Sequence, residues 1–218
     1  MGSITRSLSN NITTGGVILP AGITNASVSA VTSFANASGG TLILLSTQTA
    51  SNSSTISFTT GLDSTYDAYE FKFIDIHPAT DDVDFQFNLS TDNGSNYNVT
   101  KTSTYFVAFH NEADTDTGLS YSTLYDLAQS TAYQTLANRI GSGADESTSG
   151  SLSLFNPSST TYVKHFISTS NRYFYDNYSA NIFVAGYGNT TSAVNAVRFQ
   201  MSSGNFDGII KLYGVKKS

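Results

Sequence analysis

The sequence predicts an all-β protein: a jelly-roll-like antiparallel sandwich of two sheets, with about eight to ten strands and an extended N-terminal arm. Short segments with an apolar residue at every second position recur along the chain, as expected of strands with one buried face. Turn residues separate these segments at the spacing typical of sandwiches and barrels. Only one stretch, residues 123–128, has even a weakly helical pattern.

Composition is consistent with one such domain. The 218 residues provide enough chain to bury a substantial core. Charged residues make up 12% of the sequence, against about 25% in a typical soluble protein, and Ser, Thr, Asn and Gly fill the difference. Cysteine is absent, which excludes disulfides and thiolate metal sites. We expect neither a membrane span nor a signal peptide, because no apolar run has the necessary length or flanks.

Acidic side chains are concentrated in one part of the chain. Residues 63–116 contain eleven acidic residues and two lysines, a local charge of −9, whereas the whole chain has a net charge of −6. No cluster of Lys and Arg is present that could hold phosphates, so we expect no direct binding of nucleic acid. The acidic zone is either a solvated surface or a rim that meets a basic partner or cations.

The first forty residues are predicted to form an arm for assembly, ahead of a sandwich domain over residues 41–218. Residues 7–62 contain no charged side chain, and such a stretch has little to prevent association in water. One interpretation is a flexible, low-complexity tail. We favour an arm that becomes ordered along neighbouring subunits, because its scattered Val, Ile and Phe residues would gain from burial.

The alternation of apolar residues locates the individual strands. Strands are expected over residues 41–46, 54–59, 69–76, 83–89, 97–109, 149–155, 161–168, 181–187, 197–202 and 209–215. A change of phase at Phe73 predicts a β-bulge, and Pro78 ends that strand. The turn residues at 92–95 predict a hairpin between the strands that flank them.

The end of the chain is expected to close the fold. Val197, Phe199 and Met201 alternate with polar residues, residues 203–205 can turn the chain, and residues 209–215 are apolar on both faces. This pattern predicts a C-terminal hairpin. A strand buried on both faces at this position must insert between strands formed earlier in the chain.

Residues 110–145 differ from the rest, because they are acidic at their start and contain the weakly helical stretch. A loop of this length in a compact domain is usually functional or interface-forming. Glu112, Asp114 and Asp116 occupy alternate positions and could converge on a hard cation. The run lacks the glycine and the distal glutamate of an EF-hand loop, so a solvated acidic loop is favoured.

The sequence contains none of the common catalytic motifs. The sequence has no nucleophile elbow, phosphate-binding loop or zinc-protease helix. The three imidazoles are His77, His110 and His165, and His165 is expected to be packed or at the surface rather than catalytic. Paired carboxylates could serve glycoside hydrolysis, but no pair is marked by its spacing. We therefore expect no enzyme activity, no catalytic residues, no metal and no cofactor.

The densest aromatic cluster is the candidate contact site for a glycan or a partner. Its candidate residues are Tyr173, Tyr175, Asp176, Asn177 and Tyr178. Exposed tyrosines beside amides can stack on sugar rings and bond their hydroxyls. The same residues could equally form core and rim at one end of a sandwich.

Four phrases of the sequence are distinctive: IDIHPATD at 74–81, LFNPSSTTYVKHF at 154–166, MSSGN at 201–205 and KLYGV at 211–215. Together with a shorter likeness at residues 11–14, they resemble a group of small virion structural proteins of tailed bacteriophages from aquatic bacteria. The resemblance spans residues 41–215. Its members are known as structural, decoration or tail-fibre proteins, so it implies no catalytic residues.

The resemblance implies a location in the virion, with assembly in the host cytoplasm, and leaves two functions open. The first is a capsid decoration (cement) protein, a homo-oligomer expected to be a trimer, which binds the major capsid protein and strengthens the head. The second is a fibre or adhesin that is anchored to tail or head proteins and binds a host surface glycan. A free carbohydrate-binding module is a weaker third reading, because no export signal is seen.

Overall fold

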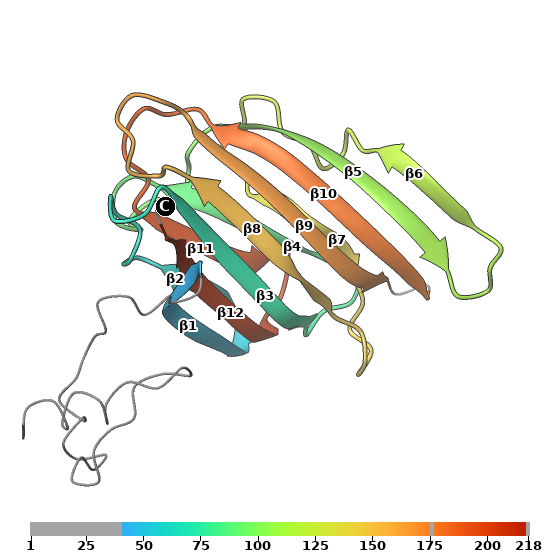
Figure 1. Cartoon of the computed structure of the whole chain (residues 1–218). Coiled ribbons are helices and arrows are strands. Elements are labelled where there is room, and N and C mark those ends of the chain that lie inside the picture. The colour runs from blue at the N-terminus through green and yellow to red at the C-terminus, as the bar shows by residue number, and fades with distance from the viewer. Residues whose placement is uncertain (1–40, 175–176, 217–218) are drawn as a thin grey trace, which may run out of the picture. The chain divides into compact units, whose positions relative to one another are not determined.

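The computed structural model describes residues 41–174 and 177–216 (Figure 1). The predicted arm over residues 1–40 therefore lies outside the described residues. The strands are β1 (Leu42–Ser53), β2 (Thr55–Phe58), β3 (Ala68–Pro78), β4 (Val83–Ser90), β5 (Lys101–Asn111), β6 (Thr117–Tyr121), β7 (Gln134–Ile140), β8 (Thr148–Phe155), β9 (Lys164–Phe174), β10 (Tyr178–Gly188), β11 (Ala196–Met201) and β12 (Phe206–Val215).

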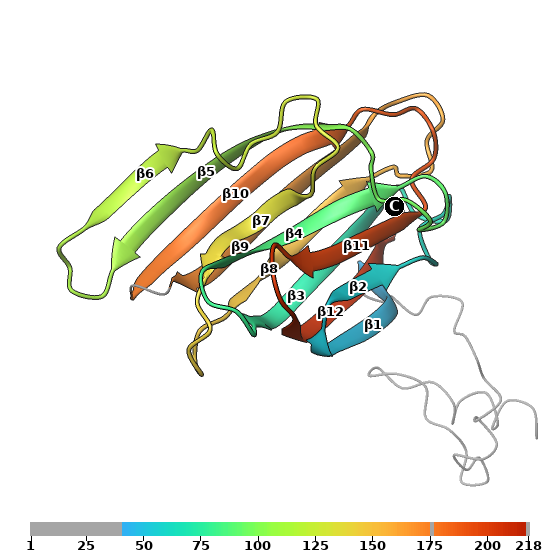
Figure 2. The same ribbon diagram turned by 180° about the vertical axis from the view of Figure 1, so that it is seen from behind.

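These strands form two antiparallel sheets that pack face to face. The larger sheet has the order β1-β12-β3-β8-β9-β10-β5-β6, and the smaller one has the order β2-β11-β4-β7. A single bridge between Ile140 and Phe174 connects them. The larger sheet is nearer the viewer in Figure 1 and the smaller one in Figure 2. The predicted all-β, two-sheet antiparallel sandwich is confirmed.

The predicted bulge is confirmed and lies one or two residues beyond Phe73. The pairing of β3 with β8 shifts between Phe73 and Ile76, and Asp75 has a left-handed φ of 51°. Phe73 and Ile76 are both buried, whereas Asp75 is exposed. The extra residue thus lets one strand keep two apolar runs of opposite phase on the same face.

The C-terminal strands insert between earlier strands, as predicted, but they do not form a hairpin. β11 lies between β2 and β4 in the smaller sheet, and β12 lies between β1 and β3 in the larger one. Residues 202–205 lead the chain from one sheet to the other, so both strands turn their apolar faces to the same core. The outward residues of β12 are half-buried or exposed, so the expected burial of both faces was also wrong.

The turn at residues 92–95 forms, but the hairpin expected there was wrong too. Asn93 and Gly94 have positive φ values of 58° and 84°, and the Ser95 amide donates to the Asp92 carbonyl at 3.3 Å. The turn connects β4 of the smaller sheet with β5 of the larger sheet. Alternation tells which face of a strand is buried, but it does not identify the neighbouring strand.

Residues 110–145 are not one long loop, because they contain β6 and β7. The weakly helical pattern of residues 123–128 does not give a helix: residues 123–125 form a turn, and no residue in the described ranges is helical. β7 was not predicted. Six of its seven residues are buried, so its sequence does not alternate between apolar and polar residues. The described strands therefore number twelve rather than eight to ten.

The core is a cluster of aromatic rings around Phe199 of β11. Five phenylalanine rings have centroids 5.2 to 6.4 Å from that of Phe199: Phe58, Phe71, Phe73, Phe85 and Phe87. They come from both sheets, and all are buried. Most of the pairs meet edge to face or at a tilt, which is the favoured geometry for aromatic rings in a core.

Candidate functional site

The acidic loop between β5 and β6 is organised by Asn111 rather than by a cation. The Asn111 side-chain oxygen accepts hydrogen bonds from the amides of Thr115 and Asp116 at 2.9 and 3.0 Å. Asp114 pairs with His110 at 3.1 Å, and Asp116 accepts a bond from the Tyr178 hydroxyl at 2.9 Å. The acids therefore have separate partners. In the described part of the chain, no group of three His, Cys, Asp or Glu side chains could hold a metal ion.

The structure separates the residues of the predicted aromatic site. Tyr173 donates a hydrogen bond to the Asn177 side chain at 3.0 Å, and its pKa is raised by desolvation and by the nearby Glu112 carboxylate. Tyr178 turns to the opposite face of the sheet, where it bonds Asp116. Tyr175 and Asp176 lie outside the described residues. Tyr173 and Asn177 are thus together, but Tyr178 is not part of the same surface.

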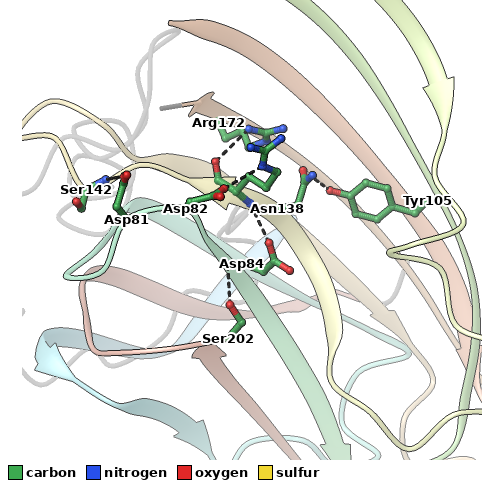
Figure 3. A network of polar contacts seen from close by, with 9 residues as sticks. Asp81, Asp82, Asp84, Tyr105, Asn138, Ser142, Arg172 and Ser202 are labelled. Atoms are coloured by element: carbon green, nitrogen blue, oxygen red, sulfur yellow. Dashed lines mark hydrogen bonds and ion pairs between the residues drawn. The ribbon is translucent and has the colours of Figure 1, made fainter. Parts of the chain in front are cut away.

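A polar network around Arg139 connects β7 with β4 and β9 (Figure 3). Arg139 has a left-handed φ of 52°. Its amide donates to the Asp84 carboxylate at 2.9 Å, and its Nε donates to Asp82 at 2.9 Å. Its carbonyl accepts a bond from Arg172 Nη1 at 3.2 Å. These bonds fix an irregular pairing of β7 with β4.

Burial is the main cause of the pKa shifts of the ionisable residues in the network. Desolvation raises the pKa of Asp84 and lowers the pKa of Arg172 to about 10. The Tyr105 hydroxyl donates to Asn138 at 2.7 Å, and burial raises the pKa of that phenol. Because the carboxylates accept bonds from β7, their evident role is to hold the backbone in place.

Two hollows flank this network. One, of about 500 Å³, lies outside the smaller sheet and includes Asp82, Tyr125 and Tyr133 in its lining. The other, of about 300 Å³, lies where the larger sheet extends past β7 and includes Val107 and Phe109. Arg139 lines both of them. Much of their polar lining is therefore already hydrogen-bonded within the protein.

The histidines are dispersed rather than gathered at a site. His77 shares a 2.6 Å hydrogen bond with the Glu146 carbonyl, and His110 lies in the acidic loop. His165 is exposed on the outside of β9, as one of the two predicted alternatives has it, with its ring 6.2 Å from that of Tyr187. None of the three is hydrogen-bonded to another in the described contacts.

Two buried lysines, Lys101 and Lys164, lie apart from the network, and burial lowers the pKa of both. The ammonium group of Lys101, at the start of β5, is fully buried. It donates to the Asn88 side-chain oxygen at 2.5 Å and to the Val99 carbonyl at 2.9 Å. Burial lowers the pKa of Lys101 to about 7. The group therefore links β5 to β4 at a cost in desolvation.

The outer side of the larger sheet has the most unusual surface. We call the outward residues of β6, β5, β10, β9 and β8 the uncharged face. They are Thr117, Leu119, Tyr121, Thr102, Thr104, Phe106, Ala108, His110, Ser179, Asn181, Phe183, Ala185, Tyr187, His165, Ile167, Thr169, Asn171, Tyr173, Ser149, Ser151, Ser153 and Phe155. Among these described residues there is no Asp, Glu, Lys or Arg.

The uncharged face is open and contains most of the large apolar side chains that are exposed in the described residues. Five of the eight large apolar side chains exposed in the described residues lie on it: Leu119, Tyr121, Phe106, Phe155 and Ile167. Phe106 stacks on Phe183 with their centroids 4.9 Å apart. A hollow of about 450 Å³ lies above Ala185. No described segment crosses in front of β5, β10 and β9 in Figure 1.

Comparison with known proteins found no match. No family model, no curated protein and no solved structure matches this chain. Within the described residues, no helix has the length and apolar character needed to cross a membrane. The case for a function therefore depends on the surface itself.

Sequence reasoning missed the uncharged face, although its components are visible in the sequence. Residues 102–109 and 177–197 contain no charged side chain. In isolation these stretches look like ordinary strands with polar outward positions. Only the pairing of β10 with both β5 and β9 shows that their uncharged sides form one continuous surface.

Proposed function

We propose that this chain is a non-enzymatic structural protein of a bacteriophage virion that acts by binding other proteins, most simply as a homo-oligomeric capsid decoration (cement) protein. Its partners are copies of itself and the major capsid protein or tail proteins. It needs no cofactor, and it joins the particle in the host cytoplasm. The main support for the proposal is the uncharged face of the larger sheet.

The uncharged face has the size and character of a protein contact surface. A residue in a sheet covers about 3.3 Å by 4.8 Å, and the five strands have between 5 and 11 residues each. The face therefore measures roughly 700 Å², close to the ~800 Å² that each partner contributes to a standard interface. Contact surfaces are depleted of charge and enriched in aromatic residues at their centre. The resemblance to virion structural proteins supports the same function.

The proposal is tested by adding the purified full chain to undecorated phage heads. We expect it to sediment with the heads, to saturate at a fixed ratio and to appear on the head surface in electron micrographs. A variant without residues 1–40 should lose binding while keeping its β-type circular dichroism. Failure of the full chain to bind heads, combined with binding to host cells, would reject the decoration function.

The alternative function is a fibre or adhesin subunit that binds a host glycan. A hollow of about 350 Å³ lined by Asn111, Glu112, Ala113 and Asn177 favours it, because Tyr173 lies next to Asn177. Carboxylate and amide groups beside a tyrosine can bond and stack on a sugar. Under this alternative, Tyr173→Ala and Glu112→Ala should each reduce binding of the labelled protein to host cells, while Thr55→Ala on the opposite sheet should not.

A further inference from the structure

We propose that the uncharged face binds a second copy of this chain, with the two larger sheets packed face to face around a two-fold axis. This inference rests on the proposed structural function and names one of its partners. It also assigns that partner to a defined surface and a defined symmetry.

The absence of charged residues makes this face the most suitable one for contact between two copies. The chain has a net charge of −6, so two copies repel each other over most orientations. In a two-fold contact the same patch occurs on both sides, so that residues near the axis meet their own counterparts. A charge at such a place would meet a like charge. The outward residues of five neighbouring strands carry no such charge, and carboxylates adjoin the uncharged face at the ends of β5 and β6, where Asp114 bonds His110 and Asp126 bonds Tyr121.

The adjoining strands of the same sheet show the contrast. The outward side of β3 contains Glu70, Lys72 and Asp75, and that of β12 contains Asp207 and Lys211. Lys72 and Glu70 form an ion pair at 2.9 Å. Charged residues therefore begin directly beyond β8, which places the boundary of the contact between β8 and β3.

The face is also complementary to itself in shape. In a two-fold contact the patch must be complementary to itself, so any protrusion on it needs a matching recess on the same patch. Ile167 protrudes from β9 with 53% of its surface exposed, and its direct neighbour across the strand pair is Ala185. The small Ala185 side chain lies under the hollow of about 450 Å³, which Ile167, His165 and Tyr187 help to line. Each copy can thus offer its Ile167 to the recess of the other.

The geometry of sheet packing fits this arrangement. Two sheets pack at about 10 Å when their side chains interdigitate. The stacked pair of Phe106 and Phe183, with Tyr121 beside Phe106 across the strand pair, provides the aromatic residues that interface centres favour. The patch area of roughly 700 Å² is near the standard contribution of one partner, so the pair would have a contact of ordinary size.

A two-fold pair differs from the trimer expected from the resemblance. A trimer joins two different, complementary patches on each subunit. The described strands offer one extended uncharged patch, which suits a contact between two identical surfaces. A mass measurement therefore separates the two assemblies.

The test is the mass of the full chain in solution, measured by sedimentation across a wide range of concentrations. We expect twice the chain mass of 23.2 kDa. Ile167→Asp removes the protrusion and adds a charge on each copy, and Ala185→Tyr fills the recess; each should weaken pairing at least about tenfold. Thr55→Asp, which adds the same charge to an exposed site on the smaller sheet, is the matched control and should pair normally.

Three outcomes would overturn the inference: a monomer at every concentration, a trimer, or a pair that the Ile167 and Ala185 variants leave intact. Circular dichroism of each variant shows that it is folded, and both changes are on the solvent side of the sheet. The head-binding assay is read independently. If the chain binds heads but does not pair, the proposed function stands and this inference is refuted. If the chain pairs but does not bind heads, this inference stands and the decoration function is refuted.

Discussion

Replacing Lys101 by methionine should remove most of the rise in stability that the protein shows between pH 7 and pH 9. The Lys101 amine is buried, and burial lowers its pKa from the ordinary 10.5 to about 7. Between about pH 7 and pH 10.5, the lysine is largely protonated in the unfolded chain and largely neutral in the folded one, so the unfolded chain binds more protons. The free energy of unfolding therefore rises with pH in this window.

The magnitude follows from the shift in pKa. The penalty for the buried charge is fully present below pH 7 and disappears above the pKa of the unfolded chain. One pH unit within the window contributes at most about 1.4 kcal/mol, which gives about 2 kcal/mol between pH 7 and pH 9. The hydrogen bonds from Lys101 to Asn88 and Val99 favour the charged form and make this an upper value.

The assay is urea unfolding at several pH values, followed by circular dichroism because the chain has no tryptophan. The wild-type protein should show the rise, and Lys101→Met should show a much shallower profile over the same range, with a small remainder from Lys164, whose pKa is also lowered by burial. Lys72→Met is the matched control, since Lys72 is a partly exposed lysine on β3 and its removal should leave the slope unchanged. A Lys101→Met protein with the wild-type slope would refute the reasoning.

Two further changes test the core and one turn. Phe199→Ala should destabilise the protein by about 3 to 5 kcal/mol, because five aromatic rings surround Phe199; a denaturant midpoint equal to that of the exposed Phe106→Ala variant would contradict this packing. Gly94→Ala should cost about 1 to 2 kcal/mol or more, because φ is +84° and a Cβ there would lie 2.6 Å from the Tyr97 hydroxyl; an unchanged thermal midpoint would show that the turn adapts freely.

Alternating apolar residues predicted the positions of most strands and the direction of their side chains. β4 is the clearest case, since Val83, Phe85 and Phe87 are all buried as their alternation requires. The same signal failed for β7, because a strand buried on nearly every residue has no alternation. It also could not assign partners: the turn residues at 92–95 form a turn as expected, but the strands on either side belong to different sheets.

The candidate surfaces were predicted less well than the fold. The cluster at Tyr173 and Tyr178 was identified from local composition, and alternation along β9 and β10 places these two residues on opposite faces. The uncharged face depends on β5, β9 and β10, which are far apart in the sequence and adjacent in the sheet. A property of several strands together cannot be recognised before their order is known.

The positions of β11 and β12 have a consequence for how this protein is made. Each occupies an interior place in its sheet, flanked by strands that the ribosome produced more than a hundred residues earlier. Until β11 is made the smaller sheet lacks an interior strand, and until β12 is made the larger sheet does, so each has strand edges with unsatisfied backbone groups. The sandwich can therefore close only after β12 has been made, and until then the folding chain must keep those open edges from pairing with a neighbour.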